Sequence, residues 1–244
     1  RQHVIAFCGI MCVVESFRES LREFPGRQEL VVALLVEPGA GRDWALTQAP
    51  LLPVAGLVAV PGFSEALSAL LSAQSPVPTQ LAGLALAASA VAVDYRVAPM
   101  PHVVRLLNAA ATANVAAKVI ACICSTQPGR VLVRDSGAIG TLVDMMFASS
   151  SVDAATAICL LAREPENAPV MIHSGAVLRF ASSLDVVQSV EALASLCVHA
   201  ECRAILLTDE SFVSKHLIPA LERSPNSPHL LRIWRALLQE PTFR

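Results

Sequence analysis

The chain has few charged side chains and almost no lysine. Asp, Glu, Lys and Arg make up 16% of its 244 residues, against about a quarter in ordinary soluble domains. Lysine occurs only as Lys118 and Lys215, and the formal net charge is −2. A protein held to nucleic acid by its charge needs a basic surface. We therefore expect no specific nucleic-acid partner.

Long apolar runs are also missing. The longest, "LAGLALAASAVAV" at 81–93, is shorter than the roughly 18 residues that a membrane span requires, so the sequence predicts no transmembrane segment. Yet 54% of the residues are hydrophobic and the mean hydropathy is +0.56. These values exclude general disorder. They indicate a substantial core and a surface that is partly covered.

The seven cysteines do not form the regular framework of a secreted, disulfide-stabilised domain. Most lie in Ala-, Val- and Leu-rich runs at helical spacing, as buried reduced thiols do. No signal-peptide pattern is present, and the chain begins with Arg rather than Met. We expect an intracellular protein, either cytoplasmic or, if the chain is a processed precursor, mitochondrial.

One short pattern recurs along the chain. "SGAI" at 136–139 returns as "SGAV" at 174–177, and the steps between successive copies of the apolar run that follows are 36, 36, 39, 38 and 41 residues. Such a period is typical of helical-repeat proteins. Each copy predicts a short helix, a sharp turn at a glycine, a helix of about ten residues and a longer helix. The six copies begin at Gly26, Gly62, Ala98, Gly137, Gly175 and His216.

Capping residues mark the predicted helix starts. Ser151, Asp185 with Gln188 three positions later, and Ser227 before Pro228 are each typical of the start of a long helix. The apolar stripe of the helix after Ser151 is predicted as Val152, Ala155, Thr156, Cys159, Leu160 and Ala162, and that of the helix after Asp185 as Val187, Val190, Leu193, Leu196 and Cys197.

Other residues predict local features of the loops and of one divergent repeat. Asn167 is predicted to cap a short helix. Pro50 and Pro53 interrupt a long apolar segment, so its helix should end or kink near Ala49. The pair Glu164 and Glu166 should lie in a loop between repeats with no partner implied.

The pattern "GAI…LVDMM…VDAATAICLLA…EN…VMIHSGAV" resembles armadillo repeats. This resemblance implies an all-α fold, a right-handed α-solenoid of about six three-helix repeats whose first and last repeats are degenerate. A two-helix HEAT-type array is the alternative, but a glycine between a short and a longer helix favours armadillo. The implied organisation is a partial repeat at 1–25, two divergent repeats at 26–97, the best-formed repeats at 98–207 and a degenerate capping repeat at 208–244.

Both ends of the array depart from the pattern. Residues 2–14 are expected to form the last helix of one repeat and residues 15–24 the short first helix of the next. The first of these is apolar nearly all round, and the last helix of the chain carries Trp234. Because the end repeats of a solenoid otherwise expose apolar faces, we expect both ends to contact a partner. Trp44, the other tryptophan, is expected in the core.

Nuclear-import adaptors of the armadillo family line their concave face with Trp and Asn at fixed positions of the third helices, and this chain matches neither. A nuclear-localisation-signal receptor is therefore disfavoured, as is a groove with a continuous positive lining. The Trp-equivalent positions are Leu84, Lys118, Thr156, Glu191 and Arg232, and the Asn-equivalent positions are Ala88, Cys122, Leu160, Ser195 and Ala236.

Three short motifs were weighed for chemistry. Cys197, His199 and Cys202 have a zinc-like spacing but lack a fourth ligand, which favours packed thiols at a helix end. Cys8 and Cys12 fit an apolar helix stripe better than a lipidation or redox pair. "PGAGRD" at 38–43 lacks the strand and the GK[ST] ending of a phosphate loop, so a surface turn is favoured.

The sequence therefore predicts a non-catalytic scaffold for protein–protein interaction, built into a larger intracellular assembly, with no cofactor, no metal and no small-molecule substrate. A peptide-binding armadillo adaptor is the alternative. An enzyme would need a nucleophile, base and orienting group together, and an RNA-binding repeat would need base-reading side chains at one position of every unit. Neither pattern is found. The candidate partner-binding residues are Phe7, Met11, Leu84, Lys118, Thr156, Glu191, Arg232 and Trp234.

Overall fold

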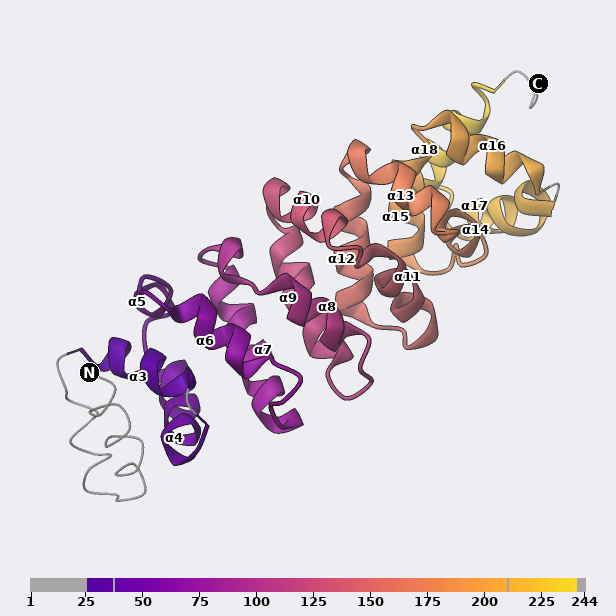
Figure 1. Cartoon of the computed structure of the whole chain (residues 1–244). Helices are drawn as coiled ribbons and strands as arrows, with labels where there is room; N and C mark the ends of the chain where they lie inside the picture. Colours follow the sequence, from indigo (N-terminus) through magenta and orange to yellow (C-terminus); the bar gives the residue numbers. More distant parts are fainter. Residues whose placement is uncertain (1–25, 37, 210, 241–244) are drawn as a thin grey trace. The chain divides into compact units, whose positions relative to one another are not determined.

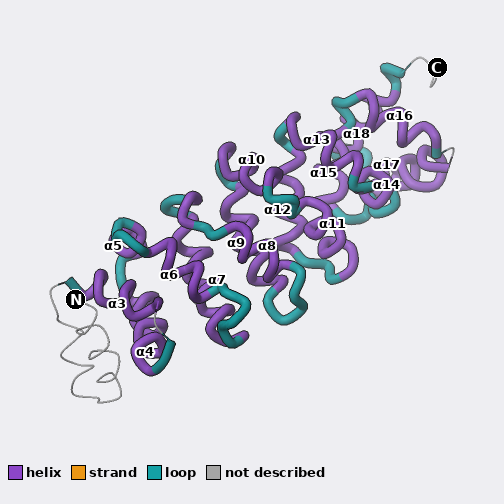
Figure 2. Tube along the Cα trace, viewed as in Figure 1, coloured by secondary structure: helices purple, strands orange, loops and turns teal. Residues whose placement is uncertain are grey.

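A computed structural model describes residues 26–36, 38–209 and 211–240. Within these residues the chain consists of helices and loops without a strand (Figure 2). It divides into two units, a first unit up to Ile123 and a second unit from Cys124 onward. The expectations for 2–14 and 15–24, and for Phe7, Met11, Cys8 and Cys12, fall outside the described residues. The segment boundaries predicted at 25, 97 and 207 stay a prediction.

The described part of the first unit begins with the second helix of a repeat and contains three copies of the repeat, which start at Gly26, Gly62 and Ala98. Helices α3, α5, α6 and α7 pack against one another in chain order, and α3 also packs against α4 (Figure 1). The elements are α3 (Arg27–Val36), α4 (Ala40–Gln48), η1 (Ala49–Leu51), α5 (Val54–Val58), α6 (Phe63–Leu70), α7 (Val77–Val91), η2 (Tyr95–Val97), α8 (Met100–Leu107) and α9 (Ala113–Cys124).

The second unit repeats a short, a middle and a third helix three times. Its third helices α12, α15 and α18 contact one another in that order (Figure 1). The elements are α10 (Gln127–Asp135), α11 (Ile139–Ala148), α12 (Val152–Ala162), η3 (Pro165–Asn167), α13 (Ala168–His173), α14 (Ala176–Ala181), α15 (Val187–Leu196), α16 (Ala200–Thr208), a π-helical segment (Phe212–Leu217), α17 (Ile218–Arg223) and α18 (Pro228–Leu237).

The glycine turns confirm the period in four of its six copies. Gly26, Gly62, Gly137 and Gly175 have φ of 85°, 91°, 74° and 75°, a left-handed conformation that a Cβ atom disfavours. Ala98 has the extended values φ −70° and ψ 120° instead. An alanine there avoids the left-handed region, and the 3₁₀ turn η2 makes the change of direction.

The sixth predicted turn, at His216, is wrong. His216 lies inside the π-helical segment, which runs directly into α17. The break between α16 and that segment lies about seven residues earlier, at Asp209. The Asp209 side chain accepts hydrogen bonds from the backbone nitrogen and the hydroxyl of Ser211, at 3.0 and 2.8 Å. An Asx turn therefore takes the place of the glycine, and it lowers the pKa of Asp209.

Two predicted caps are confirmed and two are wrong. Ser151 and Ser227 accept hydrogen bonds from the third backbone nitrogen of α12 and α18, each at 3.4 Å. The N-cap position of α15 is Val186, which makes no side-chain hydrogen bond to the helix. Asp185 therefore does not cap α15. Asn167 is fully buried and donates from Nδ2 to the carbonyl oxygen of Leu161 at 3.1 Å. Its amide thus satisfies the end of the preceding helix rather than the start of the next.

The core of the second unit corrects the predicted stripe of α12. Ala154, Ala157, Ile158 and Leu161 are fully buried, whereas Val152 and Thr156 are exposed and Leu160 is half-buried. The stripe is therefore turned by about one residue, because α12 packs on α11 on one side and on α15 on the other and so buries a face wider than a single i, i+3, i+4 row. In α15 the predicted residues are buried except Val187.

The prolines act as the sequence predicted. Helix α4 ends at Gln48, and the segment with Pro50 and Pro53 forms a 3₁₀ turn and the five-residue helix α5. Trp44 is buried in α4, as expected. "PGAGRD" begins in a turn at Gly39, but the residues from Ala40 onward belong to α4, so the predicted surface turn covers only its first part.

Three polar side chains of the second unit each bind a carbonyl oxygen at the end of the long helix that precedes them. Arg130 donates from Nη1 to the carbonyl oxygen of Cys124 at 3.2 Å, and Arg203 makes the same contact with Cys197 at 2.9 Å. Asn167 reaches Leu161 at the equivalent place. All three donors lie six residues after the carbonyl that they bind. The last carbonyl groups of a helix lack partners inside the helix. These three hydrogen bonds therefore stabilise the repeat junctions at which they occur.

None of the helices in the described ranges combines the length and apolar character needed to cross a bilayer.

Gly175→Ala should lower the free energy of unfolding by about 1 kcal/mol, because Ala disfavours positive φ. No heavy atom lies within 4 Å of the Cβ position at Gly175, so the effect comes from backbone strain. Gly140→Ala is the matched control. It also has open space, lies within α11, and should stabilise slightly. Chemical denaturation checks both, and a loss of equal size at Gly140 would contradict the assignment.

Candidate protein-binding surface

The third helices of the second unit leave one row of positions open to solvent. We call this row the ladder face, and it comprises Thr156, Leu160, Glu191, Ser195, Arg232 and Ala236. Each helix contributes two residues four positions apart, which lie on the same side of a helix. Thr156 and Arg232 are exposed and the other four are half-buried. Since α12, α15 and α18 pack in sequence, the row is continuous across the unit.

The polar groups of the ladder face are largely satisfied by their own helices. Thr156 donates from Oγ1 to the carbonyl oxygen of Val152 at 2.8 Å, and Ser195 donates from Oγ to that of Glu191 at 3.1 Å. The Glu191 carboxylate accepts from Nη2 of Arg163 at 2.6 Å. The Asn-equivalent positions of the ladder face hold Leu160, Ser195 and Ala236, none of which carries an amide side chain.

Cys159 lies just behind the ladder face and joins two third helices. Its Sγ is 3.3 Å from the carbonyl oxygen of Gln188 at the start of α15. Burial, with a smaller contribution from the negative charge of Glu191, raises the pKa of Cys159 to about 12. The group is therefore a neutral thiol that packs and donates, and not a nucleophile.

Alkylation should reveal this raised pKa. At pH 8 only about one Cys159 in ten thousand would be thiolate, given the pKa of about 12. Iodoacetamide should therefore label Cys159 far more slowly in the folded chain than in guanidinium chloride, with a rate that rises about tenfold per pH unit between pH 7 and 9. Peptide mass spectrometry measures the rate at each cysteine. Native labelling at the unfolded rate would contradict the buried position.

A hollow lies between α15 and α18 at one end of the ladder face. Its volume is about 520 Å³. Arg232 and Arg235 of α18 line this hollow, and both are exposed. We call this feature the arginine hollow, and its lining residues are Ala194, Val198, Pro228, Arg232, Arg235, Ala236 and Gln239.

The other predicted partner-binding residues take different places. Leu84 in α7 is fully buried in the core of the first unit, because the positions around it pack on α5 and α6, so its side chain does not line a surface. Lys118 on α9 is exposed. Trp234 on α18 is half-buried. The roles of Lys118, Trp234 and the ladder residues in binding stay predictions, and Phe7 and Met11 lie outside the described part of the chain.

No protein-family model and no curated protein sequence matches the chain. Solved structures do match. An engineered protein has a TM-score of 0.68 at 18% identity, over 86% of this chain and 96% of that one. A designed armadillo repeat protein has a TM-score of 0.68 at 21% identity, over 86% of this chain and 99% of that one. Another, in complex with the peptide (KR)4, has a TM-score of 0.67 at 21% identity, over the same shares.

This chain has an armadillo-like repeat fold. The similarity confirms the all-α solenoid that the sequence predicted, and the three-helix repeats of the second unit agree with armadillo rather than with two-helix HEAT units. At these identities the similarity establishes the fold.

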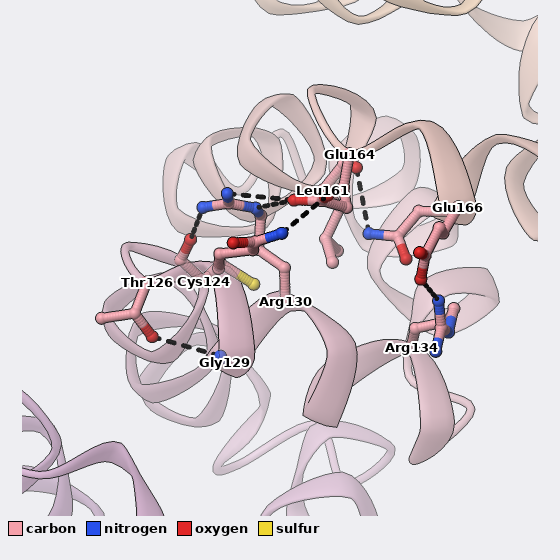
Figure 3. A network of polar contacts seen from close by, with 10 residues as sticks. Cys124, Thr126, Gly129, Arg130, Arg134, Leu161, Glu164 and Glu166 are labelled. Atoms are coloured by element: carbon pink, nitrogen blue, oxygen red, sulfur yellow. Dashed lines mark hydrogen bonds and ion pairs between the residues drawn. The ribbon is translucent and has the colours of Figure 1, made fainter.

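The armadillo-like repeats of the second unit are joined by ion pairs that the sequence interpretation missed. Arg130 donates from Nε and Nη2 to one Glu164 oxygen at 3.2 and 3.1 Å, and Arg134 donates to Glu166 at 2.9 Å (Figure 3). The sequence implied no partner for the two glutamates, and the structure gives one to each. Arg203 binds Glu240 at 2.6 Å in the equivalent way. The sequence did contain a signal for these junctions: Asn167 lies 37 residues after Arg130, and Arg203 lies 36 residues after Asn167.

The remaining motif with possible chemistry is the pair of cysteines around His199. Cys197 and Cys202 are both buried, and their contact together with burial raises the pKa of Cys197. Across the residues that the structure describes, no group of three His, Cys, Asp or Glu side chains is placed to hold a metal ion. The arrangement is that of packed thiols at the α15–α16 turn.

Proposed function

We propose that the chain is a non-catalytic scaffold that binds an extended segment of another protein along the ladder face. The observation that carries this proposal is the row of exposed and half-buried positions shared by α12, α15 and α18. A face of this kind suits a ligand that runs across successive repeats.

The structural neighbours support a peptide as the ligand. A designed armadillo repeat protein was solved with the peptide (KR)4 bound. Apart from Arg232, the polar side chains of the ladder face are short or already paired. Binding would therefore depend on the partner's side chains and on the shape of the face more than on hydrogen bonds to its backbone.

The test uses a displayed library of random peptides selected on the full chain, with binders measured by calorimetry. The double variant Thr156→Arg/Ser195→Arg fills the ladder face with long side chains and leaves the core intact. The matched control is Leu178→Arg, an exposed residue of α14 outside the face. The proposal expects binders that the double variant loses and the control retains. Absence of binders, equal effects of both variants, or a turnover activity of the isolated chain would refute it.

A second role, as a built-in subunit of a larger assembly, is favoured by exposed valines. Val152 and Val187, the first residues of α12 and α15, are 70% and 69% exposed. Apolar residues at equivalent positions of adjacent repeats form the kind of patch that marks a protein contact. Sedimentation of the chain tests this role: association or dye binding that Val152→Ser/Val187→Ser removes supports it, and a monodisperse monomer that binds no hydrophobic dye refutes it.

A further inference from the structure

The arginine hollow is positively charged, and no described residue forms an ion pair with its two arginines. Arg232 and Arg235 lie three residues apart on α18 and therefore on neighbouring positions of one helix face. Of the described residues that line the hollow, none is acidic. The rest of its lining is small or apolar, and Val198 is 61% exposed.

Two carboxylates close in sequence to the lining of the hollow are already engaged. Glu191 of α15 accepts from Arg163 at 2.6 Å, and Glu240 after α18 accepts from Arg203 at 2.6 Å. Each of these carboxylates is thus neutralised by a different arginine. The two guanidinium groups of the hollow remain available although the whole chain carries a net charge of −2.

We propose that the arginine hollow binds an acidic segment of a partner protein, with carboxylates on Arg232 and Arg235 and one apolar side chain against Val198. This inference rests on the proposed function and specifies the chemistry of the ligand at one end of the ladder face. A guanidinium group matches a carboxylate with two parallel hydrogen bonds, which gives orientation as well as attraction. A basic ligand such as (KR)4, which a designed neighbour holds, would be repelled by the same two residues.

Three fluorescein-labelled peptides of equal length serve as probes for the full chain. The first alternates Asp and Glu around a central Leu, the second replaces the acidic residues by Lys and Arg, and the third replaces them by Gly and Ser. Fluorescence anisotropy gives each affinity at low ionic strength and at about 0.15 M, where charges separated by more than about 8 Å are screened. The acidic peptide should bind at least about tenfold more tightly than the other two. Its affinity should fall as salt is added.

Charge reversal identifies the site. Arg232→Glu/Arg235→Glu should weaken the acidic peptide by about tenfold or more and favour the basic one. The control Arg223→Glu changes an exposed arginine of α17 that lies outside the hollow and should change the affinity less than about twofold. Arg232→Gln/Arg235→Gln repeats the measurement without introduced negative charge. Circular dichroism confirms that each variant is folded.

Several outcomes overturn the inference. Equal affinity for the acidic and the neutral peptide would do so, as would an unchanged affinity in both double variants. Competition by a single-stranded DNA oligonucleotide as strong as that of the acidic peptide would indicate a general polyanion site instead. If the library selection yields binders on the ladder face that are not acidic, the proposed function stands and this inference fails. If it yields none, the proposed function itself fails.

Discussion

Leu161→Asp is expected to lower the free energy of unfolding by about 3–5 kcal/mol, enough to unfold the second unit at ordinary temperature. Leu161 is fully buried in α12, and its carbonyl oxygen accepts the Asn167 amide at 3.1 Å. An aspartate there would place a charge in the core. Circular dichroism during thermal and urea denaturation measures the loss.

Leu160→Asp is the matched control, because it makes the same chemical change one residue away. Leu160 is half-buried on the ladder face, so the new carboxylate can reach water. We expect a loss of less than about half that at Leu161. Equal losses at the two positions would show that the face of α12 assigned to the core is wrong.

Arg130→Ala is expected to lower the free energy of unfolding by about 2 kcal/mol. The side chains of Arg130 and Glu164 are only 18% and 13% exposed. Removing the arginine leaves the carboxylate with Gln127 alone, at 3.4 Å, and also removes a donor from the Cys124 carbonyl. A partly buried charge without its partner is costly, and the remaining solvent access reduces the cost below that of a fully buried pair.

Arg134→Ala provides the comparison on the same helix. Arg134 pairs with Glu166, but the Glu166 side chain is 71% exposed, and exposed pairs contribute about 1 kcal/mol or less. Urea denaturation of both single variants, of Glu164→Ala and of Arg130→Ala/Glu164→Ala completes a double-mutant cycle. If Arg134→Ala lowered the free energy of unfolding as much as Arg130→Ala, burial would not explain the contribution of the Arg130–Glu164 ion pair.

Local backbone rules made part of this structure readable in advance. Gly137 and Gly175 recur with the period of the repeats because only glycine takes the left-handed turn without strain, and both adopt it. Helix α4 ends just before Pro50, because proline in a helix interior lacks the N–H donor and clashes with the preceding turn. Ser151 and Ser227 cap through their own side chains. These effects act over a few residues, so the sequence shows them directly.

The binding surface was predictable only in part. The ladder positions were found by counting from the repeat, but their exposure depends on how much of each third helix its neighbours cover. Leu84 is covered completely and Thr156 is not. The arginine hollow was not predicted, since it requires Val198, which follows α15, and Arg232 of α18 to line the same hollow.

By itself the sequence determined the repeat, the all-α class and most helix boundaries, because periodic apolar residues, glycine and proline act locally. Only the tertiary structure decided which residues face inward and which charges pair. Leu161 rather than Leu160 enters the core because α12 is held between α11 and α15. Glu164 finds Arg130 across 34 residues because two short segments meet at a repeat junction. Such contacts depend on packing between elements far apart in the chain, which no local pattern specifies.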